Sequence, residues 1–174
     1  IVMQLHPDEP LIIEGIHALN PMLLNDDIDR DKLFRVYVSA LTTLNIDDHN
    51  RIHTTDARLL RRLVRDYETR GASMEHTLSM WPSVRRGEEK WIFPYQENAD
   101  ALFNTTLVYE VSVLKKYVYP LLQEVPKESP CYAAARDITK VLNYFLDADG
   151  IEDEIPPTSI LREFIGGCTF YRKD

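Results

Sequence analysis

Short apolar segments separated by polar stretches recur along the first two thirds of the chain. Residues 9–21 contain a continuous apolar run between Pro10 and Gly15, which is typical of a fully buried strand in a parallel sheet. Residues 32–40 carry apolar side chains at loosely alternating positions, and residues 99–107 form another apolar segment. The pattern therefore predicts about three strands of a parallel sheet.

Helical periodicity is clearest over residues 56–69. Thr54, Thr55 and Asp56 supply good helix-starting chemistry, and Gly71 is expected to end the helix. The residues expected on its apolar face are Leu59, Leu60, Leu63, Val64 and Tyr67.

Further helices are expected on both sides of the last strand. One follows Gly71 and runs up to Pro82, one covers residues 107–122, and one runs from about 131 to 147. After an acidic linker, Pro157 introduces a short helix that Gly166 and Gly167 close. Strands that alternate with helices, followed by extra C-terminal helices, indicate an α/β fold.

The composition limits the partners. Asp and Glu outnumber Lys and Arg by 28 to 20, so a surface for nucleic acid or anionic membrane is not expected. No apolar run has the length of a membrane span. The spacing of Cys131 and Cys168 fits neither a metal site nor a redox motif. Two thiols so far apart in the chain are typical of a reduced cytosolic protein. We therefore expect a cytoplasmic protein without nucleic-acid or membrane partners.

A concentrated basic patch contrasts with this acidic background. Residues 61–71, RRLVRDYETRG, contain four arginines, and Arg58, Arg62 and Arg65 share the helix face opposite the leucines. Arrays of guanidinium groups suit phosphate because each offers rigid, bidentate donors that keep their charge. The same spacing also fits a solvated helix face whose arginines pair with nearby acidic residues. Spacing alone leaves both interpretations open.

Three ordered blocks carry a family resemblance. LIIEGIHAL, RLLRRLVRDYETRG and IFPYQENADALFNT occur in the order and approximate spacing of the C-terminal half of the uridine kinase and phosphoribulokinase family, which this chain resembles from residue 9 to about 122. The resemblance implies a partial P-loop kinase fold. Residues 1–125 would be the C-terminal part of that kinase domain, including its lid, and residues 126–174 a helical extension.

The resemblance also implies roles for particular residues. In this family the arginine-rich helix belongs to a lid that closes over ATP. Arg62 and Arg65 would contact the transferred phosphates as catalytic residues, and Arg58 and Arg70 would complete the ATP-binding set. Glu14 matches the acidic residue that ends the family's third strand, where it would hold Mg²⁺ directly or through water. A strand-terminal glutamate that caps a nearby helix is the alternative.

The chain departs from the family pattern at several points. None of the six glycines begins the phosphate-binding loop GxxxxGK[ST], and the strand with the catalytic aspartate is missing too. Ala72 and Met80 stand where uridine kinases usually carry an arginine and a glutamine. We therefore expect a fragment of a longer protein, inactive by itself. Its acceptor would be a nucleoside or another small hydroxyl compound.

The missing loop strand has a structural consequence. In the family it lies between the strands that match residues 10–16 and 33–39, so its absence leaves two unpaired edges. Unpaired edges tend to find partners. We expect the two strands either to pair with each other in a shifted register or to join a second copy in a homodimer.

Several histidines and aromatic residues remain open to two interpretations. His49 and His53 have ligand-like spacing for zinc but lie in a loop-like segment, which favours a polar connector. His17 could face the acceptor site or serve as a core or capping residue. The aromatic side chains could stack a base or anchor packing; they are Trp81, Trp91, Phe93 and Tyr95.

Two functions from different classes fit these features. The first is an ATP-dependent nucleoside kinase that transfers the γ-phosphoryl group to a sugar hydroxyl, with ATP and Mg²⁺ as cofactors. The second is a non-catalytic module that senses nucleotides or binds a protein partner through its C-terminal helices.

Overall fold

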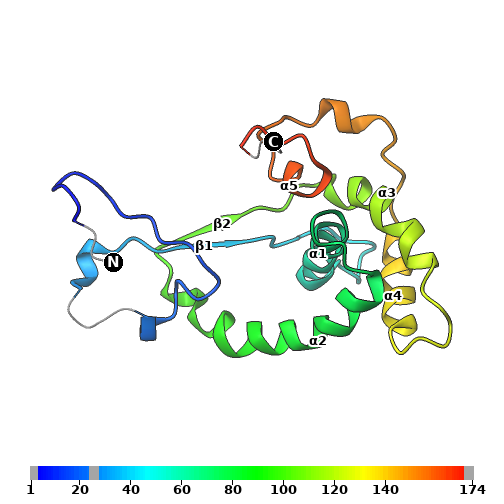
Figure 1. Ribbon diagram of the computed structural model, residues 1–174, viewed down its shortest axis with the longest axis horizontal. Helices are drawn as coiled ribbons and strands as arrows, with labels where there is room; N and C mark the ends of the chain where they lie inside the picture. Colours follow the sequence, from blue (N-terminus) through cyan, green and yellow to red (C-terminus); the bar gives the residue numbers. More distant parts are fainter. Residues whose placement is uncertain (1–3, 24–27, 171–174) are drawn as a thin grey trace. The chain divides into compact units, whose positions relative to one another are not determined.

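The computed structural model describes residues 4–23 and 28–170 (Figure 1). Its strands are β1 (Val36–Ser39) and β2 (Ala101–Asn104). The α-helices are α1 (Thr54–Arg70), α2 (Met74–Trp91), α3 (Glu110–Gln123), α4 (Tyr132–Leu142) and α5 (Arg162–Ile165). Four 3₁₀ helices in the described part are η1 (Pro21–Leu23), η2 (Arg30–Lys32), η3 (Phe93–Asn98) and η4 (Ile151–Glu154).

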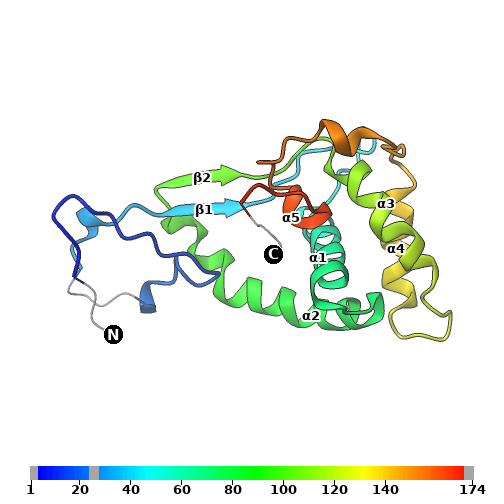
Figure 2. The same cartoon turned by 45° about the horizontal axis from the view of Figure 1, so that its top comes forward.

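The strands form a parallel two-stranded sheet, as Figure 2 shows. The carbonyl oxygen of Arg35 accepts hydrogen bonds from the N–H groups of Asp100 and Ala101, and that of Ser39 accepts one from Thr105 at 2.9 Å. The chain between the strands contains α1 and α2, the kind of long crossover that parallel strands require. The predicted α/β class with extra C-terminal helices is therefore confirmed.

The chain divides into two compact units, which α2 and both strands connect. One consists of the described residues of Ile1–Tyr37 with Arg85–Leu102, and the other of Val38–Val84 with the described residues of Phe103–Asp174. The second unit contains α1, α3, α4, α5 and the basic patch. The predicted domain division, 1–125 and 126–174, stays a prediction.

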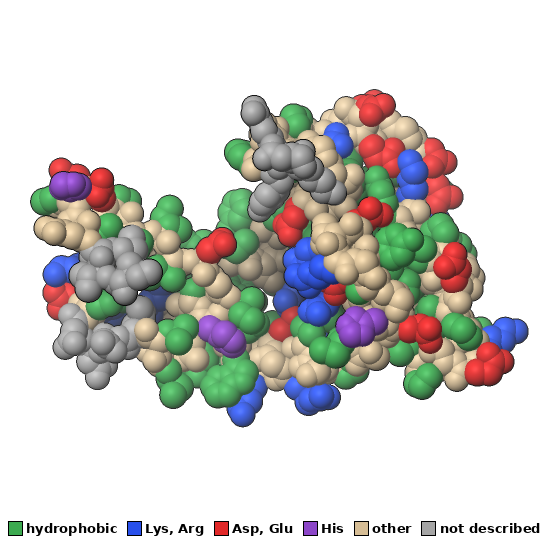
Figure 3. All heavy atoms as spheres, viewed as in Figure 1, with side chains coloured by type: hydrophobic (Ala, Val, Ile, Leu, Met, Phe, Trp, Pro, Cys, Tyr) green, Lys and Arg blue, Asp and Glu red, His purple; other side chains and the backbone are tan. Residues whose placement is uncertain are grey.

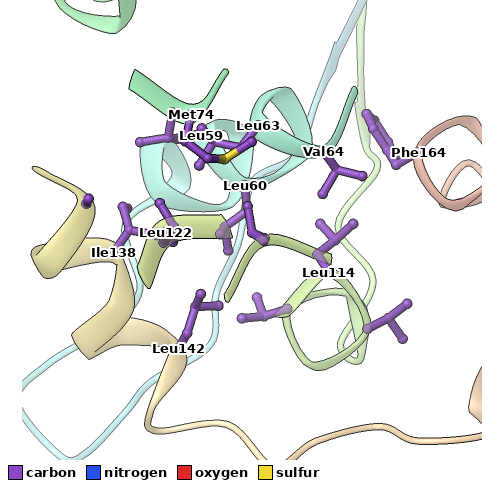
Figure 4. Packing of buried hydrophobic residues seen from close by; sticks show 14 of the residues in the cluster. Leu59, Leu60, Leu63, Val64, Met74, Leu114, Leu122, Ile138, Leu142 and Phe164 are labelled. Carbon is purple, nitrogen blue, oxygen red and sulfur yellow. The ribbon is translucent and has the colours of Figure 1, made fainter. Parts of the chain in front are cut away.

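The core of the second unit is built on the apolar face of α1. Leu60 and Leu63 are fully buried there, and Leu114 of α3 and Leu142 of α4 are buried equally well. Figure 4 shows these side chains packed together. The helical pattern predicted α1 and four of its five apolar-face residues correctly, but Tyr67 is 44% exposed. The C-terminal helices α4 and α5 also contribute to this core, which fixes them against α3 and α1.

The strand predicted for residues 10–16 is wrong. The segment has no regular secondary structure up to Glu14, and a turn begins at Gly15. Its large apolar side chains are exposed, with Ile12 at 88% and Ile13 at 66%. In the described residues no neighbouring strand pairs with this run, and a single extended segment without a paired strand does not form a stable sheet in water. The expected pairing between residues 10–16 and 33–39 is therefore also absent from the described part.

Two predicted helix ends are wrong as well. The helix that begins at Met74 continues through Pro82 to Trp91, and α4 ends at Leu142 instead of near residue 147. Beyond the proline, Arg85 pairs with Glu88 at 3.0 Å and with Glu89 at 3.2 Å. Such pairs three and four residues apart stabilise a helix. They help α2 to continue where the proline removes one backbone donor.

Gly71 ends α1 in the left-handed region, with φ at 62°. We expect Gly71→Ala to lower the free energy of unfolding by about 1 kcal/mol, because a Cβ is strained at positive φ. Apart from Gly71 and its two chain neighbours, no described residue has an atom within 4 Å of a Cβ at this position, so a clash contributes nothing. Gly87→Ala is the matched control: this glycine lies within α2 with equally open surroundings. It should be neutral or stabilising in urea denaturation, and an equal loss from both substitutions would contradict the backbone explanation.

Candidate functional site

The basic patch lies on α1, which places arginines on the side away from the core. Figure 3 shows Lys and Arg side chains gathered over α1 with acidic side chains beside them. Arg58, Arg62 and Arg65 are all partly exposed, while Leu60 and Leu63 on the other side are fully buried. The helical phase predicted from the sequence is therefore confirmed.

Asp66 orients two of the arginines that are predicted to bind phosphate. Its buried carboxylate accepts a hydrogen bond from Arg62 Nε at 3.1 Å and another from Arg70 Nη1 at 2.8 Å. The hydroxyl of Thr77 also donates to it, at 3.4 Å. A buried carboxylate shared by two guanidinium groups limits their rotation. Arg62 uses only Nε in this contact, so its Nη groups have the capacity to bind another acceptor.

Arg65 lies at the edge of a cavity. The cavity has a volume of about 610 Å³. It is lined by Arg65, Glu68 and Thr69 from α1 and by residues 162–168. Across it, Arg65 Nη1 is 3.5 Å from Oε1 of Glu163 in α5. The Arg65 Nε is buried and has no hydrogen-bond partner in the described structure. This guanidinium therefore has unused donor capacity.

Arg61 has a different role from the other arginines. Its side chain is buried and donates to the carboxylate of Glu110, to the Thr105 carbonyl at 2.7 Å and to the Thr105 hydroxyl at 3.1 Å. Its guanidinium carbon also lies 5.7 Å from the centre of the Phe164 ring. Arg61 thus fastens α1 to the end of β2 and to the start of α3.

This buried cluster was missed in the sequence, although a signal was present. Arg61 lies four residues after Ala57 and three before Val64, in the helical phase of the buried face. A charged residue in that phase indicates a buried ion pair. The partner, Glu110, lies 49 positions away and could not be found from local spacing.

The other predicted site residues lie in loops. Glu14 and His17 are both exposed, and Glu14 belongs to the first compact unit. The proposed Mg²⁺ role of Glu14 stays a prediction. The part of the chain that the structure describes contains no group of three side chains suited to hold a metal ion.

The histidine-containing loop before α1 is organised by an aspartate. The Asp47 carboxylate accepts hydrogen bonds from the N–H groups of His49 and Asn50 at 2.8 and 2.7 Å. The Asn50 side chain and these two N–H groups lower the pKa of Asp47. Such a turn favours the polar-connector interpretation of His49 and His53. Nearby, burial raises the pKa of Asp56 in the first turn of α1, opposed by the charge of His53.

Comparisons with known proteins give a consistent result. The model of the phosphoribulokinase/uridine kinase family matches residues 3–112. The uridine kinases of Staphylococcus aureus strains JH9, Newman and Mu3 are each 31% identical over 103 residues, which is 59% of this chain. The chain spans 42% of the length of these relatives. No solved structure matches the chain.

Proposed function

This chain belongs to the phosphoribulokinase/uridine kinase family, and from that premise we propose that it is part of an ATP-dependent nucleoside kinase. The protein would transfer the γ-phosphoryl group of ATP to a hydroxyl of a nucleoside sugar or a similar small acceptor. The observation that carries the proposal is the arginine face of α1. There Asp66 holds Arg62 and Arg70, and Arg65 has a buried donor that finds no acceptor among the described residues.

The arginines contribute mainly through charge. In phosphoryl transfer, the bond from phosphorus to the leaving oxygen breaks while a bond to the acceptor oxygen forms, and negative charge is spread over the phosphoryl oxygens. Arg62 and Arg65 would donate hydrogen bonds to those oxygens. Arg58 and Arg70 would bind the remaining phosphates. Because Asp66 limits the rotation of Arg62, less reorganisation is needed when the nucleotide binds.

Glu14 fits a limited role toward Mg²⁺. This ion usually keeps several waters and takes one or two carboxylates in addition to the substrate phosphates. A single exposed carboxylate such as Glu14 suits that role, whereas a complete protein cage would need more ligands. Bound Mg²⁺ would neutralise phosphate charge.

The chain alone would be inactive. It contains neither a GxxxxGK[ST] loop nor the strand with the family's aspartate base. Both strands of the sheet expose apolar side chains that another part of a protein would normally cover. About half or more of the surface is exposed for each of these residues: Val36 and Val38 of β1, and Leu102 and Phe103 of β2. We propose that the rest of a kinase domain, or a second copy in a homodimer, covers these strands.

The composition supports a proposal for the cellular location of the protein. The acidic net charge of -8 and two free cysteines support a cytoplasmic protein without nucleic-acid partners. Among the described residues, no helix has both the length and the apolar character needed to cross a bilayer. We propose ATP and a small hydroxyl acceptor as its binding partners.

A nucleoside-dependent assay of ADP release tests this function. The intact protein that contains the chain should release ADP from ATP and Mg²⁺ when a nucleoside is added, and the isolated 174-residue chain should not. Uridine, cytidine and non-nucleoside sugars should be compared, since Ala72 and Met80 depart from the usual uridine kinase pattern. Binding of ATP without turnover of any acceptor would favour the alternative of a nucleotide-sensing module.

A further inference from the structure

The cavity beside Arg65 is built from two distant parts of the chain. One wall is the last part of α1, and the other is α5 with the following Gly166, Gly167 and Cys168. Its volume of about 610 Å³ lies within the range of small-molecule sites. The second wall lies outside residues 3–112, which the family model matches. The family relationship therefore does not account for this cavity.

Arg65 is the cation in this cavity with donors to spare. Its contact with Glu163, at 3.5 Å, lies at the long limit for a hydrogen bond, and its Nε has no partner in the described structure. The other arginine of the cavity is already engaged. Arg162 donates to the carbonyl oxygens of Glu152 and Ile155, each at 2.6 Å, and to that of Gly166 at 3.4 Å.

The backbone around Glu163 is anchored on both sides. Arg162 ties it to the preceding segment by donating to the carbonyl oxygens of Glu152 and Ile155, and Phe164 is buried in the core. The Glu163 side chain itself is 37% exposed. A side chain on such a fixed support can leave Arg65 by changing its rotamer, without any movement of α5.

We propose that this cavity receives a phosphate group of the bound nucleotide at Arg65, and that the Glu163 carboxylate holds Arg65 until that phosphate replaces it. This inference rests on the proposed kinase function and adds a built-in competitor to it. A phosphate offers a guanidinium two parallel charge-assisted hydrogen bonds, whereas Glu163 makes one long contact. The exchange therefore favours phosphate. Because the Arg65–Glu163 ion pair must break first, it lowers the affinity for the nucleotide by the free energy of a partly exposed ion pair.

Glu163→Gln tests the competition, because it removes the charge and keeps the shape. In the intact protein, we expect ATP with Mg²⁺ to bind about two- to fivefold more tightly to this variant, as measured by calorimetric titration. Glu68→Gln is the matched control, since Glu68 lines the same cavity and makes no hydrogen bond or ion pair with Arg65 in the described structure. It should change the affinity less. In an Arg65→Ala background, Glu163→Gln should have no effect.

The outcomes separate this inference from the proposed function. Equal ATP affinities of Glu163→Gln and Glu68→Gln would overturn the competition. So would a gain that persists without Arg65, or one that appears with inorganic phosphate but not with ATP. In all three cases the kinase proposal would stand if Arg65→Ala weakened ATP binding. Loss of the kinase proposal itself would appear as no ATP binding by the unmodified protein.

Discussion

Replacing Arg61 by methionine is expected to lower the free energy of unfolding by about 3–5 kcal/mol, the usual cost of breaking a buried ion pair from one side. Both partners are buried, with side-chain exposures of 10% for Arg61 and 1% for Glu110. Without the guanidinium, the Glu110 carboxylate keeps the N–H of Leu107, at 3.3 Å, but no counter-charge from Arg61. Thr105 loses two hydrogen bonds as well.

Urea denaturation of Arg61→Met should show this loss as a lower midpoint. Arg86→Met is the control, because Arg86 is exposed on α2, and its effect should stay within about 0.5 kcal/mol. The double variant Arg61→Met/Glu110→Leu should regain much of the stability, since an apolar pair of similar volume often replaces a buried ion pair at little cost. A stability loss in Arg61→Met no larger than in Arg86→Met would contradict the anchoring role of Arg61.

Two arginines of α1 are expected to have a large effect on turnover. In the intact protein, Arg62→Ala and Arg65→Ala should each lower kcat/KM by about 30- to 1000-fold, because removing one donor to developing phosphoryl charge costs about 2–4 kcal/mol. The loss should fall on kcat if the contact forms mainly in the transition state. The nucleoside-dependent ADP-release assay measures both constants.

A stability control makes this result interpretable. In Arg62→Ala, the Asp66 carboxylate keeps Arg70 at 2.8 Å and Thr77 at 3.4 Å, so the fold should lose little. Arg86→Ala removes an exposed arginine from α2 and should turn over normally. If both Arg62→Ala and Arg65→Ala kept normal turnover, the α1 arginines would be a solvated surface that pairs with nearby carboxylates.

The local sequence pattern predicted α1 correctly, because the residues at helical spacing are also the ones that pack into the core. The leucines of α1 recur at helical spacing and are buried together, and Gly71 ends the helix as its conformational freedom suggests. Residues 10–16 show the limit of this reasoning. An apolar run indicates a strand only if a neighbouring strand pairs with it, and the described residues supply none.

Contacts between distant residues explain why Arg61 and the Arg65–Glu163 pair were missed. The sequence-based prediction assigns no role to Arg61, because its partner Glu110 lies 49 positions away in another helix. Arg65 and Glu163 are 98 positions apart, so local residue spacing cannot predict their contact. The helix after Gly71 was expected to stop at Pro82, but pairs formed by Arg85 support its continuation. Arginine-rich segments alone do not distinguish buried anchors from ligand-binding side chains.

The proposed function requires that the arginine face of α1 binds the phosphates of a nucleoside triphosphate. Equilibrium titration of the intact protein with ATP and Mg²⁺ tests it most directly, with the same Arg62→Ala, Arg65→Ala and Arg86→Ala variants. We predict saturable binding that the first two substitutions weaken and that Arg86→Ala leaves unchanged. Absence of binding, or equal affinity in all variants, would contradict the claim.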